Sequence, residues 1–308
     1  MITHKNLVSV SGGKDSTATL LVAIERGVDN LSAVFCDTGN ENEITYEYVR
    51  YLERATGVAI RWLKQDFTDW WWRRRDYVRD KWPEKGVDKE VIARTIEFYE
   101  QGPTGNPFLD LCIIKNRFPS RKAQFCTQYL KSEPATEYAL ELMADGSTLT
   151  SWQGIRADES PNRATQPEFE ERGGGYSILR PIHKWNVEMV FDIHRKMGIE
   201  PNPLYRQGMG RVGCMPCINA RKDEILEISK RFPEQIDRIA EWEKIVGLVS
   251  KRSNATFFPA PGSNIGAWDR GNVRAIVEWS KTSRGGKMLD MFRNEEPALC
   301  SSAYGLCE

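Results

Sequence analysis

Several features that would point to particular protein classes are scarce or absent in this sequence. The chain has only 3 histidines among its 308 residues, and the spacing of His4, His183 and His194 is not typical of a metal site. Its 43 lysine and arginine residues are balanced by 43 acidic residues, so the formal net charge is zero. That balance argues against a protein that coats nucleic acid non-specifically, although it leaves room for a local basic patch.

The sequence also lacks any apolar run of the roughly 18 residues that a membrane-spanning helix needs, so we expect no membrane partner. Residues 1–6 have no apolar core of the kind found in secretory signals, which favours a cytoplasmic location. In that reducing compartment the 7 cysteines are expected to be ligands, nucleophiles or core residues rather than disulfides.

The most informative segment that is present is a glycine-containing turn near the N-terminus. It follows the apolar run 7–10 and precedes the helical pattern 18–24, so a strand leads through the turn into a helix. The start of a helix offers N–H groups and partial positive charge, and glycines let the backbone approach a phosphate closely. The Walker A pattern does not fit, because Asp15 follows the glycine-lysine pair where Ser or Thr is required. The residues expected to bind a nucleotide are Ser11, Gly12, Gly13, Lys14, Asp15, Ser16 and Thr17.

The rest of the chain alternates strand and helix patterns before it becomes mostly helical. The alternation predicts an α/β fold with a parallel twisted sheet and helices on both faces. We divide the chain into a nucleotide-binding domain, 1–218, and a helical C-terminal region with a cysteine-bearing tail, 219–308. Residues 66–125 are less regular, and we interpret Trp70–Arg75 within them as a partly buried loop; base stacking by this run is the alternative. The predicted strands are 31–36, 59–63 and 148–152, and the predicted helices are 43–55 and one that starts near 133.

Five motifs, in a fixed order, resemble the phosphoadenosine phosphosulfate (PAPS) reductases and the related PP-loop ATP pyrophosphatases. The turn at 11–17 is similar to their SGGxDS pyrophosphate-binding loop. The other four motifs are Asp37-Thr38-Gly39, the G-I-R-x-x-E-S-x-x-R stretch 154–163, Arg180–Trp185, and the NPLY…GCxPC stretch 202–217. The resemblance covers residues 7–217 and implies an adenine nucleotide α-hydrolase-like fold. It further implies that Asp37, Thr38, Gly39 and Gly154 flank the nucleotide.

The resemblance also implies roles for the charged residues of these motifs. Lys14 and the loop backbone would hold the β- and γ-phosphates of ATP together with Mg²⁺, and Asp15 would orient that metal or the loop. The three residues expected around the acceptor are Arg156, Glu159 and Arg163, and the two arginines are suited to clamping phosphate or sulfate oxygens. The alternative for both arginines is a surface position in which Glu159 holds them.

The cysteines predict a metal centre. Cys214 and Cys217 have the spacing of a chelating pair that suits zinc or an iron–sulfur cluster. The segment around Cys126 resembles the region that supplies two cluster thiolates in adenylyl-sulfate reductases, but Thr127 replaces the second of them. It also resembles the equivalent stretch in the ATP pyrophosphatase component of DNA phosphorothioation systems. Cys36 and Cys112 lie in apolar runs and are expected to be core residues.

Two ligand sets for a [4Fe–4S] cluster follow, and zinc remains the alternative metal for either. In the first, Cys126, Cys214 and Cys217 are completed by Cys300 or Cys307. In the second, Cys214, Cys217, Cys300 and Cys307 bind the cluster, which leaves Cys126 free near the nucleotide to carry a persulfide.

The end of the chain bears on the choice of activity. PAPS reductases end in a segment E-C-G-L-H whose cysteine attacks the substrate sulfur, and alignment of the Gly-Leu pairs puts Tyr304 at that position. We therefore favour an ATP pyrophosphatase that adenylates an acceptor and supports sulfur transfer. The alternatives are a thiol-dependent reductase of adenylyl sulfate or PAPS that releases sulfite, and a non-catalytic nucleotide-binding subunit of a nucleic-acid modification complex. The expected partners are an adenine nucleotide, a sulfur donor or thiol reductant and, as one open choice of acceptor, a nucleic acid.

Overall fold

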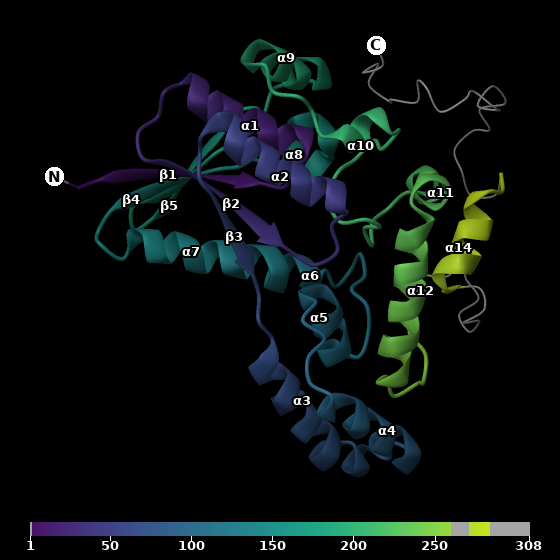
Figure 1. The fold of residues 1–308 in the computed structure, drawn as a ribbon. Helices are drawn as coiled ribbons and strands as arrows, with labels where there is room; N and C mark the ends of the chain where they lie inside the picture. The colour runs from purple at the N-terminus through teal and green to yellow at the C-terminus, as the bar shows by residue number, and fades with distance from the viewer. Residues whose placement is uncertain (1, 260–270, 284–308) are drawn as a thin grey trace.

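The fold is built on one six-stranded sheet, seen in a computed structural model that describes residues 2–259 and 271–283 (Figure 1). The strand order is β3-β2-β1-β4-β6-β5, and all neighbouring strands run parallel except β5, which is antiparallel to β6. The strands are β1 (His4–Val10), β2 (Leu31–Asp37), β3 (Ile60–Lys64), β4 (Thr148–Trp152), β5 (Phe169–Gly173) and β6 (Tyr176–Leu179). The predicted α/β class is confirmed, but the β5–β6 hairpin, which turns at the glycines 173–175, was not foreseen.

Helices cover both faces of this sheet, as the alternating pattern predicted. Figure 1 shows α1 (Lys14–Glu25), α2 (Glu43–Thr56) and α9 (Val187–Met197) on one face, and α7 (Glu133–Met143) on the other. The first face buries an apolar core that includes Val8, Leu20 and Phe35. The smaller core under α7 includes Leu7 and Leu149. Because β1 pairs parallel with both β2 and β4, the carboxyl ends of these three strands lie at one edge of the sheet.

Asparagine caps fix where several helices begin. The Asn42 side chain accepts a hydrogen bond from the Ile44 amide at 2.9 Å at the start of α2, and Asn186 does the same for Met189 at the start of α9. These bonds satisfy N–H groups that have no partner inside the helix. Gly57 and Gly198 end the same two helices in the left-handed conformation, where glycine has no Cβ penalty.

The segment between β3 and β4 corrects our interpretation of the tryptophan–arginine run. It forms α3 (Thr68–Lys81), η1 (Pro83–Lys85), α4 (Lys89–Glu100), α5 (Pro107–Lys115), the short α6 (Phe125–Thr127) and the π-type turn η2 (Gln128–Ser132). Trp70–Arg75 therefore lies on a helix rather than a loop. Successive helical residues point about 100° apart, so Trp71 is fully buried and donates from Nε1 to the Tyr99 carbonyl at 2.8 Å, while Trp70 and Trp72 are half-buried.

The C-terminal part is mostly helical, as predicted, and packs on this inserted segment. Its described helices are α11 (Lys222–Arg231), α12 (Pro233–Leu248) and α14 (Val273–Ser280). Residues of α5, α12 and α14 share one large apolar core, in which the rings of Phe108 and Trp242 stack with centroids 5.6 Å apart. The remaining short elements are η3 (Ala157–Glu159), α8 (Pro161–Ala164) and α10 (Pro203–Arg206). Cys300 and Cys307 lie outside the described residues.

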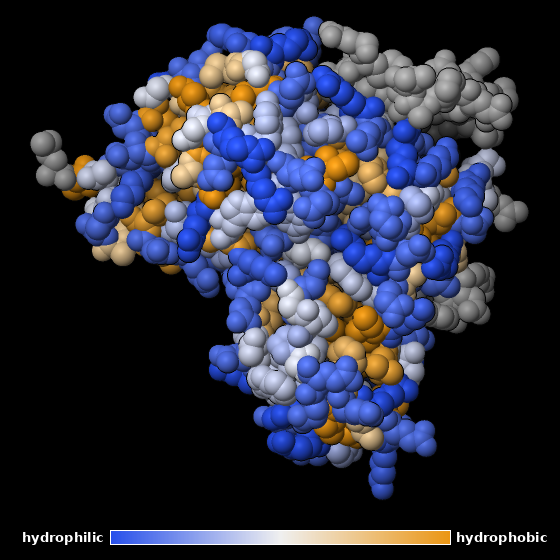
Figure 2. Space-filling model, in the orientation of Figure 1, coloured by the Kyte–Doolittle hydropathy of each residue, from blue (hydrophilic) through white to orange (hydrophobic). Residues whose placement is uncertain are grey.

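The surface is mainly polar on the side shown in Figure 2, where hydrophobic side chains show through in separate groups. Among the described residues, no helix is both long and apolar enough to cross a bilayer.

Candidate functional site

The predicted phosphate loop joins β1 to α1 as a tight, internally bonded turn. Gly12 has φ +75°, and a Cβ there would lie 2.8 Å from Thr45 Cγ2, so the sequence needs glycine for both its conformation and its packing. The Ser16 hydroxyl donates to the Gly13 carbonyl at 2.9 Å and accepts from the Ser11 amide at 3.0 Å. Gly13 is the N-cap of α1, and Thr17 N–H bonds to its carbonyl at 3.0 Å. The loop thus directs the start of α1 toward the carboxyl edge of the sheet.

This loop lies at the point where the strand order reverses. From β1 the chain proceeds to β2 and β3 on one side and later returns to β4 on the other. In open α/β sheets, ligands bind beyond the carboxyl ends of the strands at such a point. Gly154 follows β4 and packs against the loop so closely that a Cβ would lie 2.8 Å from the Asp15 carbonyl carbon and oxygen. Gly154, the first residue of the matched stretch 154–163, therefore has a steric reason to be glycine.

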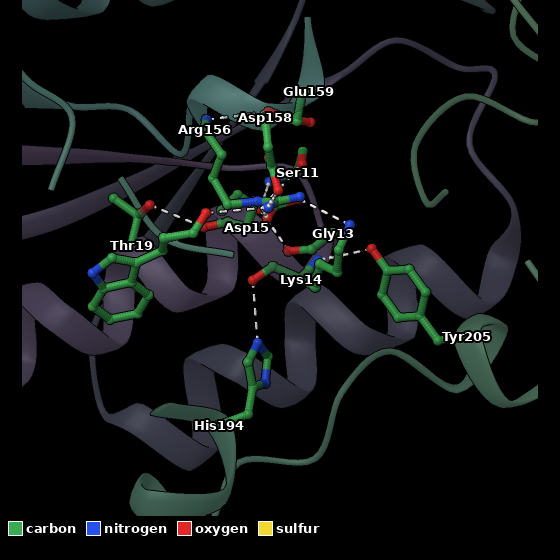
Figure 3. A network of polar contacts seen from close by, with 12 residues as sticks. Ser11, Gly13, Lys14, Asp15, Thr19, Arg156, Asp158, Glu159, His194 and Tyr205 are labelled. Atoms are coloured by element: carbon green, nitrogen blue, oxygen red, sulfur yellow. Dashed lines mark hydrogen bonds and ion pairs between the residues drawn. The ribbon is translucent and has the colours of Figure 1, made fainter. Parts of the chain in front are cut away.

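Asp15 holds two cations together at this edge, as Figure 3 shows. Its Oδ2 lies 3.1 Å from Lys14 Nζ and its Oδ1 lies 2.5 Å from Arg156 Nε. All three side chains are largely buried. Burial alone would lower the pKa of Arg156, but the carboxylates of Asp15 and Asp158 outweigh it and raise that pKa above its usual value. The arrangement fixes two positive groups where a polyphosphate approaching the loop would meet them.

The two other residues expected around the acceptor are close to Arg156 but are bonded to each other. Glu159 Oε2 accepts from the Arg156 amide at 3.2 Å and also pairs with the Arg163 guanidinium. Arg156 is only 3% exposed, whereas the side chain of Arg163 is 43% exposed. Arg156 therefore belongs to the phosphate loop's charge network, and Arg163 lies at its solvent side, held by Glu159.

Three side chains from one later segment hold the backbone of the loop. Asn202 Nδ2 donates to the Gly12 carbonyl at 3.1 Å, the Tyr205 hydroxyl accepts from the Lys14 amide at 2.9 Å, and His194 Nε2 lies 3.2 Å from the Lys14 carbonyl. All three residues are buried. The Lys14 amide, one of the N–H groups at the start of α1, therefore already has a protein partner.

The surroundings of His194 favour the neutral form of its ring. Burial lowers the pKa of His194, because a charged ring would lose its hydration, although the Lys14 and Ile199 carbonyls act in the opposite direction. Its Nδ1 lies 3.3 Å from the Ile199 carbonyl. A neutral imidazole has one N–H, so it donates to one of the two carbonyls at a time.

The Asp37–Gly39 segment closes the next part of the edge and connects it to the cysteine motif. Asp37 Oδ1 accepts from the Tyr46 hydroxyl at 2.7 Å, and the Thr38 hydroxyl donates to the buried Glu41 carboxylate at 2.7 Å. Glu41 Oε1 also accepts from the Cys214 thiol at 3.6 Å, and the two residues form an isolated β-bridge. Arg238 of α12 donates to the Met215 carbonyl at 2.8 Å, which ties the C-terminal region to this segment.

The described cysteines gather near this segment but do not form a ready metal site. Cys112 and Cys217 lie in the large apolar core, and Cys126 and Cys214 are partly buried against it. Burial raises the pKa of Cys214 to about 12, while the neighbouring Lys131 acts in the opposite direction. Burial is also the first cause of a raised pKa at Cys126. In the part of the chain that the structure describes, no group of three or more His, Cys, Asp or Glu side chains is arranged to hold a metal ion.

The two cysteines that we expected in the core differ from each other. Cys112 is fully buried in α5, as expected. Cys36 is only half-buried, and its thiol donates to the Lys131 carbonyl at 3.6 Å. The η2 turn that follows Cys126 is therefore anchored to the end of β2.

A cavity of about 660 Å³ lies beyond the ends of β2 and β3. Asp37 and Gly39 line it, together with the stacked rings of Tyr46 and Trp62 and the Arg238 side chain. None of the loop residues 11–17 is among its lining residues, so this space is separate from the phosphate loop.

Several residues of this site had no role in the sequence prediction. Asn202 and Tyr205 were part of a matched motif, but their contact with the loop spans about 190 residues and depends on the fold. His194 and Glu41 belong to none of the matched motifs, so nothing in the sequence assigned either of them to the site. Only Glu41, two residues after Gly39, was near a motif.

Comparison with known proteins places the chain in a family. Residues 5–220 match the phosphoadenosine phosphosulfate reductase domain. The chain belongs to this family, and membership supports a sulfonucleotide-related function for it.

The chain is also similar to individual proteins. The chain is 44% identical over 326 residues to an uncharacterized 37.8 kDa protein of Escherichia phage 186, with 98% of this chain and 96% of that protein covered. It is 23% identical over 229 residues to a phosphoadenosine 5'-phosphosulfate reductase of Buchnera aphidicola, with 74% of this chain and 77% of the enzyme covered. Among solved structures, PAPS reductase from Candida auris matches 69% of this chain and 82% of its own, at 18% identity and a TM-score of 0.43.

Proposed function

We propose that this protein is an ATP pyrophosphatase of the PAPS reductase family that adenylates an acceptor and so prepares it for sulfur transfer. The observation that carries the proposal is the joining of an SGGKDS loop to Arg156 through Asp15 at the switch point of the sheet. This arrangement supplies backbone amides, a lysine and an arginine on two sides of one space. Three adjacent phosphates need such a two-sided set of donors more than a single phosphate does.

Each residue then has a defined part in the reaction. Lys14 and the amides of the loop bind the β- and γ-phosphates, and Arg156 approaches from the β4 side. An acceptor oxygen attacks the α-phosphorus, the bond from that phosphorus to the bridging oxygen breaks, and pyrophosphate leaves. Mg²⁺ bound together with ATP would share the negative charge of this leaving group. Asp15 holds Lys14 and Arg156 in place throughout, so its carboxylate positions the cations.

The second step replaces the adenylated oxygen by sulfur. A sulfide-level donor attacks the carbon that bears the adenylyl group, the carbon–oxygen bond breaks, and AMP leaves with the bonding electron pair. Glu159 and Arg163 lie at the solvent side of Arg156, and in this proposal they contact the acceptor. We assign the nucleoside half of ATP to the cavity lined by Asp37 and Gly39.

The test of this function is pyrophosphate release from ATP with Mg²⁺, measured with and without candidate acceptors. We expect release in the wild-type protein and its loss in Lys14→Ala, and we expect AMP in equal amount to pyrophosphate once a sulfide donor is added with the acceptor. ADP and phosphate as products would contradict the proposal, because they indicate attack at the γ-phosphorus.

A second candidate function is reduction of adenylyl sulfate or PAPS by a thiol, with release of sulfite. It is favoured by relatives of that name, including an adenosine 5'-phosphosulfate reductase of Allochromatium vinosum that is 31% identical over 103 residues, 33% of this chain and 37% of that enzyme. Sulfite formation from adenylyl sulfate or PAPS in the presence of thioredoxin, with no pyrophosphate release from ATP, would establish this function in place of the first.

We also propose that Cys126, Cys214 and Cys217 contribute to a [4Fe–4S] cluster, with a ligand from the tail, or that Cys214 and Cys217 do so with Cys300 and Cys307. The thiols fit such a cluster by their chemistry and shared core, although the described residues do not form a complete site. Iron and sulfide analysis of anaerobically purified protein tests this. Loss of iron in Cys214→Ser is expected with either ligand set. Loss of iron in Cys126→Ser is expected only with the first set, and retained iron in that variant would indicate the second. Zinc without iron would contradict the cluster.

A further inference from the structure

A strongly basic segment borders the candidate site and has no part in the proposed binding of ATP. Residues 115–131 contain five lysines and arginines and no acidic residue, although the whole chain has as many acidic as basic residues. Four of these cations, Lys115, Arg117, Arg121 and Lys122, define what we call the basic surface. Within the described parts of the chain, none of the four forms an ion pair with a carboxylate.

The shape of the segment exposes these charges. Ser120 and Ala123 bond to each other through both amides, at 3.2 and 3.0 Å, so Arg121 and Lys122 form the tip of a tight turn. Arg117, Arg121 and Lys122 are all exposed. A cluster of unpaired, solvated cations on a fixed turn attracts a polyanion.

Aromatic rings lie among the cations. The rings of Trp70 and Tyr129 are 5.0 Å apart by their centroids, and Lys115 Nζ lies 5.2 Å from the first and 4.4 Å from the second. Both rings are half-buried, so part of each is accessible. The Arg117 guanidinium lies 5.6 Å from the ring of Phe125. Cations beside accessible aromatic rings are the combination that holds the backbone and unpaired bases of a single strand.

The tryptophan–arginine run itself is less suited to this role. Arg75 pairs with Asp76 at 2.9 Å and with Glu100 at 3.2 Å, and Arg79 pairs with Asp76 and Asp80. The carboxylates offset the charge of α3. Residues 115–131 are therefore better suited to bind a polyanion than the Trp70–Arg75 run is.

The basic surface leads directly to the candidate site. Cys126 follows Lys122 by four residues, and Lys131, the end of the segment, is bonded through its carbonyl to Cys36 at the end of β2. A strand bound on the surface would thus extend to the carboxyl edge of the sheet, where the nucleotide loop lies.

We propose that this surface binds single-stranded nucleic acid, and that a base of this strand is the acceptor. The second clause rests on the proposed function, whereas the first does not. Unpaired bases are required because both stacking on Tyr129 and access of a base to an enzyme site need the base outside a duplex. Single-stranded DNA and RNA share the chemistry that the surface would recognise, a sugar-phosphate chain with unpaired bases. The test therefore measures the two separately.

The test measures binding of labelled oligonucleotides of about 16 nucleotides to the full chain by fluorescence anisotropy. The arms are single-stranded DNA, single-stranded RNA and a DNA duplex, each at salt concentrations from about 50 to 200 mM. The variant R117A/R121A/K122A removes three cations of the surface. The matched control, R54A/K89A/K244A, removes three exposed cations elsewhere and changes the net charge equally.

We expect the surface variant to bind single strands at least about tenfold more weakly than the control, and to lower the slope of log affinity against log salt by about 2. Tyr129→Ala is expected to weaken binding about tenfold with little change of slope, because it removes stacking rather than charge. The proposal is overturned if the wild-type protein binds neither single-stranded DNA nor single-stranded RNA, or if both triple variants lose affinity equally. It is also overturned if the duplex binds as tightly as a single strand, because that result would indicate charge attraction alone.

Binding of a non-hydrolysable ATP analogue to the same preparations separates this proposal from the function proposed above. Retained ATP binding with no oligonucleotide binding would reject the surface only. Retained oligonucleotide binding in wild type that shows no nucleotide affinity would support the surface and reject the ATP-dependent function.

Discussion

At the scale of single residues, the candidate site depends on how Asp15 is placed. This one carboxylate contacts Lys14 and Arg156, which come from the start of α1 and the loop after β4. Because both partners are largely buried, losing the carboxylate would leave two cations to repel each other with little solvent screening. The position that distinguishes this loop from the Walker A pattern is therefore the one that organises its charges.

Gly154→Ala tests the contact between the two halves of the site. A Cβ at this position would lie 2.8 Å from the Asp15 backbone, where neither group can move without shifting the loop. We expect the variant to lose about 1–3 kcal/mol of stability and to bind nucleotide more weakly. Gly210→Ala is the control, because its Cβ would meet nothing within 4 Å. Unchanged nucleotide affinity in Gly154→Ala would show that this contact does not shape the site.

Tyr205→Phe tests the support of the loop from the NPLY motif. The variant keeps the ring but removes the hydroxyl that accepts from the Lys14 amide, which leaves a buried N–H without that partner. We expect a loss of about 1–3 kcal/mol in the free energy of unfolding and a higher KM for ATP. Tyr138→Phe, at a tyrosine with no described hydrogen bond, should change neither quantity. A kcat loss with KM unchanged would contradict a role in placing the loop for binding.

At the scale of elements, the inserted helices and the C-terminal helices form one packing unit beside the sheet. The apolar core that they share runs from Trp71 in α3 through Phe108 in α5 to Trp242 in α12 and Ile276 in α14. α12 then reaches the site through Arg238 and the Met215 carbonyl. Stability of the helical unit is therefore coupled to the position of the cysteine motif.

Two adjacent tryptophans give a matched test of helix α3. We expect Trp71→Ala to lower the free energy of unfolding by about 3–5 kcal/mol, because the whole side chain and its bond to the Tyr99 carbonyl are buried. Trp72→Ala should cost less than half as much, since this ring is half-buried and contacts the Arg75 guanidinium at 4.9 Å. Urea denaturation measures both, and equal losses would contradict the assignment of the run to a helix with Trp71 facing the core.

Glu243 of α12 predicts how the stability of the helical unit depends on pH. Its buried carboxylate accepts from the Phe257 and Val273 amides, and burial raises its pKa from 4.5 to about 7. The folded protein therefore binds this proton more tightly than the unfolded chain does, so the contribution to stability falls as pH rises between those two values.

Glu243→Gln should remove that contribution. We expect the difference in unfolding free energy between about pH 5 and pH 8 to shrink by a few kcal/mol relative to wild type. Glu241→Gln, two residues away and exposed, serves as the control and should leave the difference unchanged. An identical pH dependence in Glu243→Gln and wild type would rule out a raised pKa at this residue.

At the scale of the whole molecule, local patterns were predictable and long-range contacts were not. The phosphate loop and the strands β1–β4 follow from residues that are neighbours in sequence, so the turn, the α/β class and the helical C-terminal part could be predicted. The contacts of Asn202, Tyr205 and His194 with the loop join residues about 180–190 positions apart, and only the fold reveals them. The tryptophan run was assigned to a loop because its burial depends on α4, which packs against it through tertiary contacts.

We propose that the turn after β1 binds the polyphosphate of an adenine nucleotide, and the sharpest test is isothermal titration calorimetry of the full chain with a non-hydrolysable ATP analogue and Mg²⁺. We predict one site per chain with affinity that falls at least about tenfold in Lys14→Ala, where a charge-assisted bond of about 1.5–3 kcal/mol is lost. Folded wild-type protein that shows no heat of binding with any adenine nucleotide, including adenylyl sulfate, would contradict the claim.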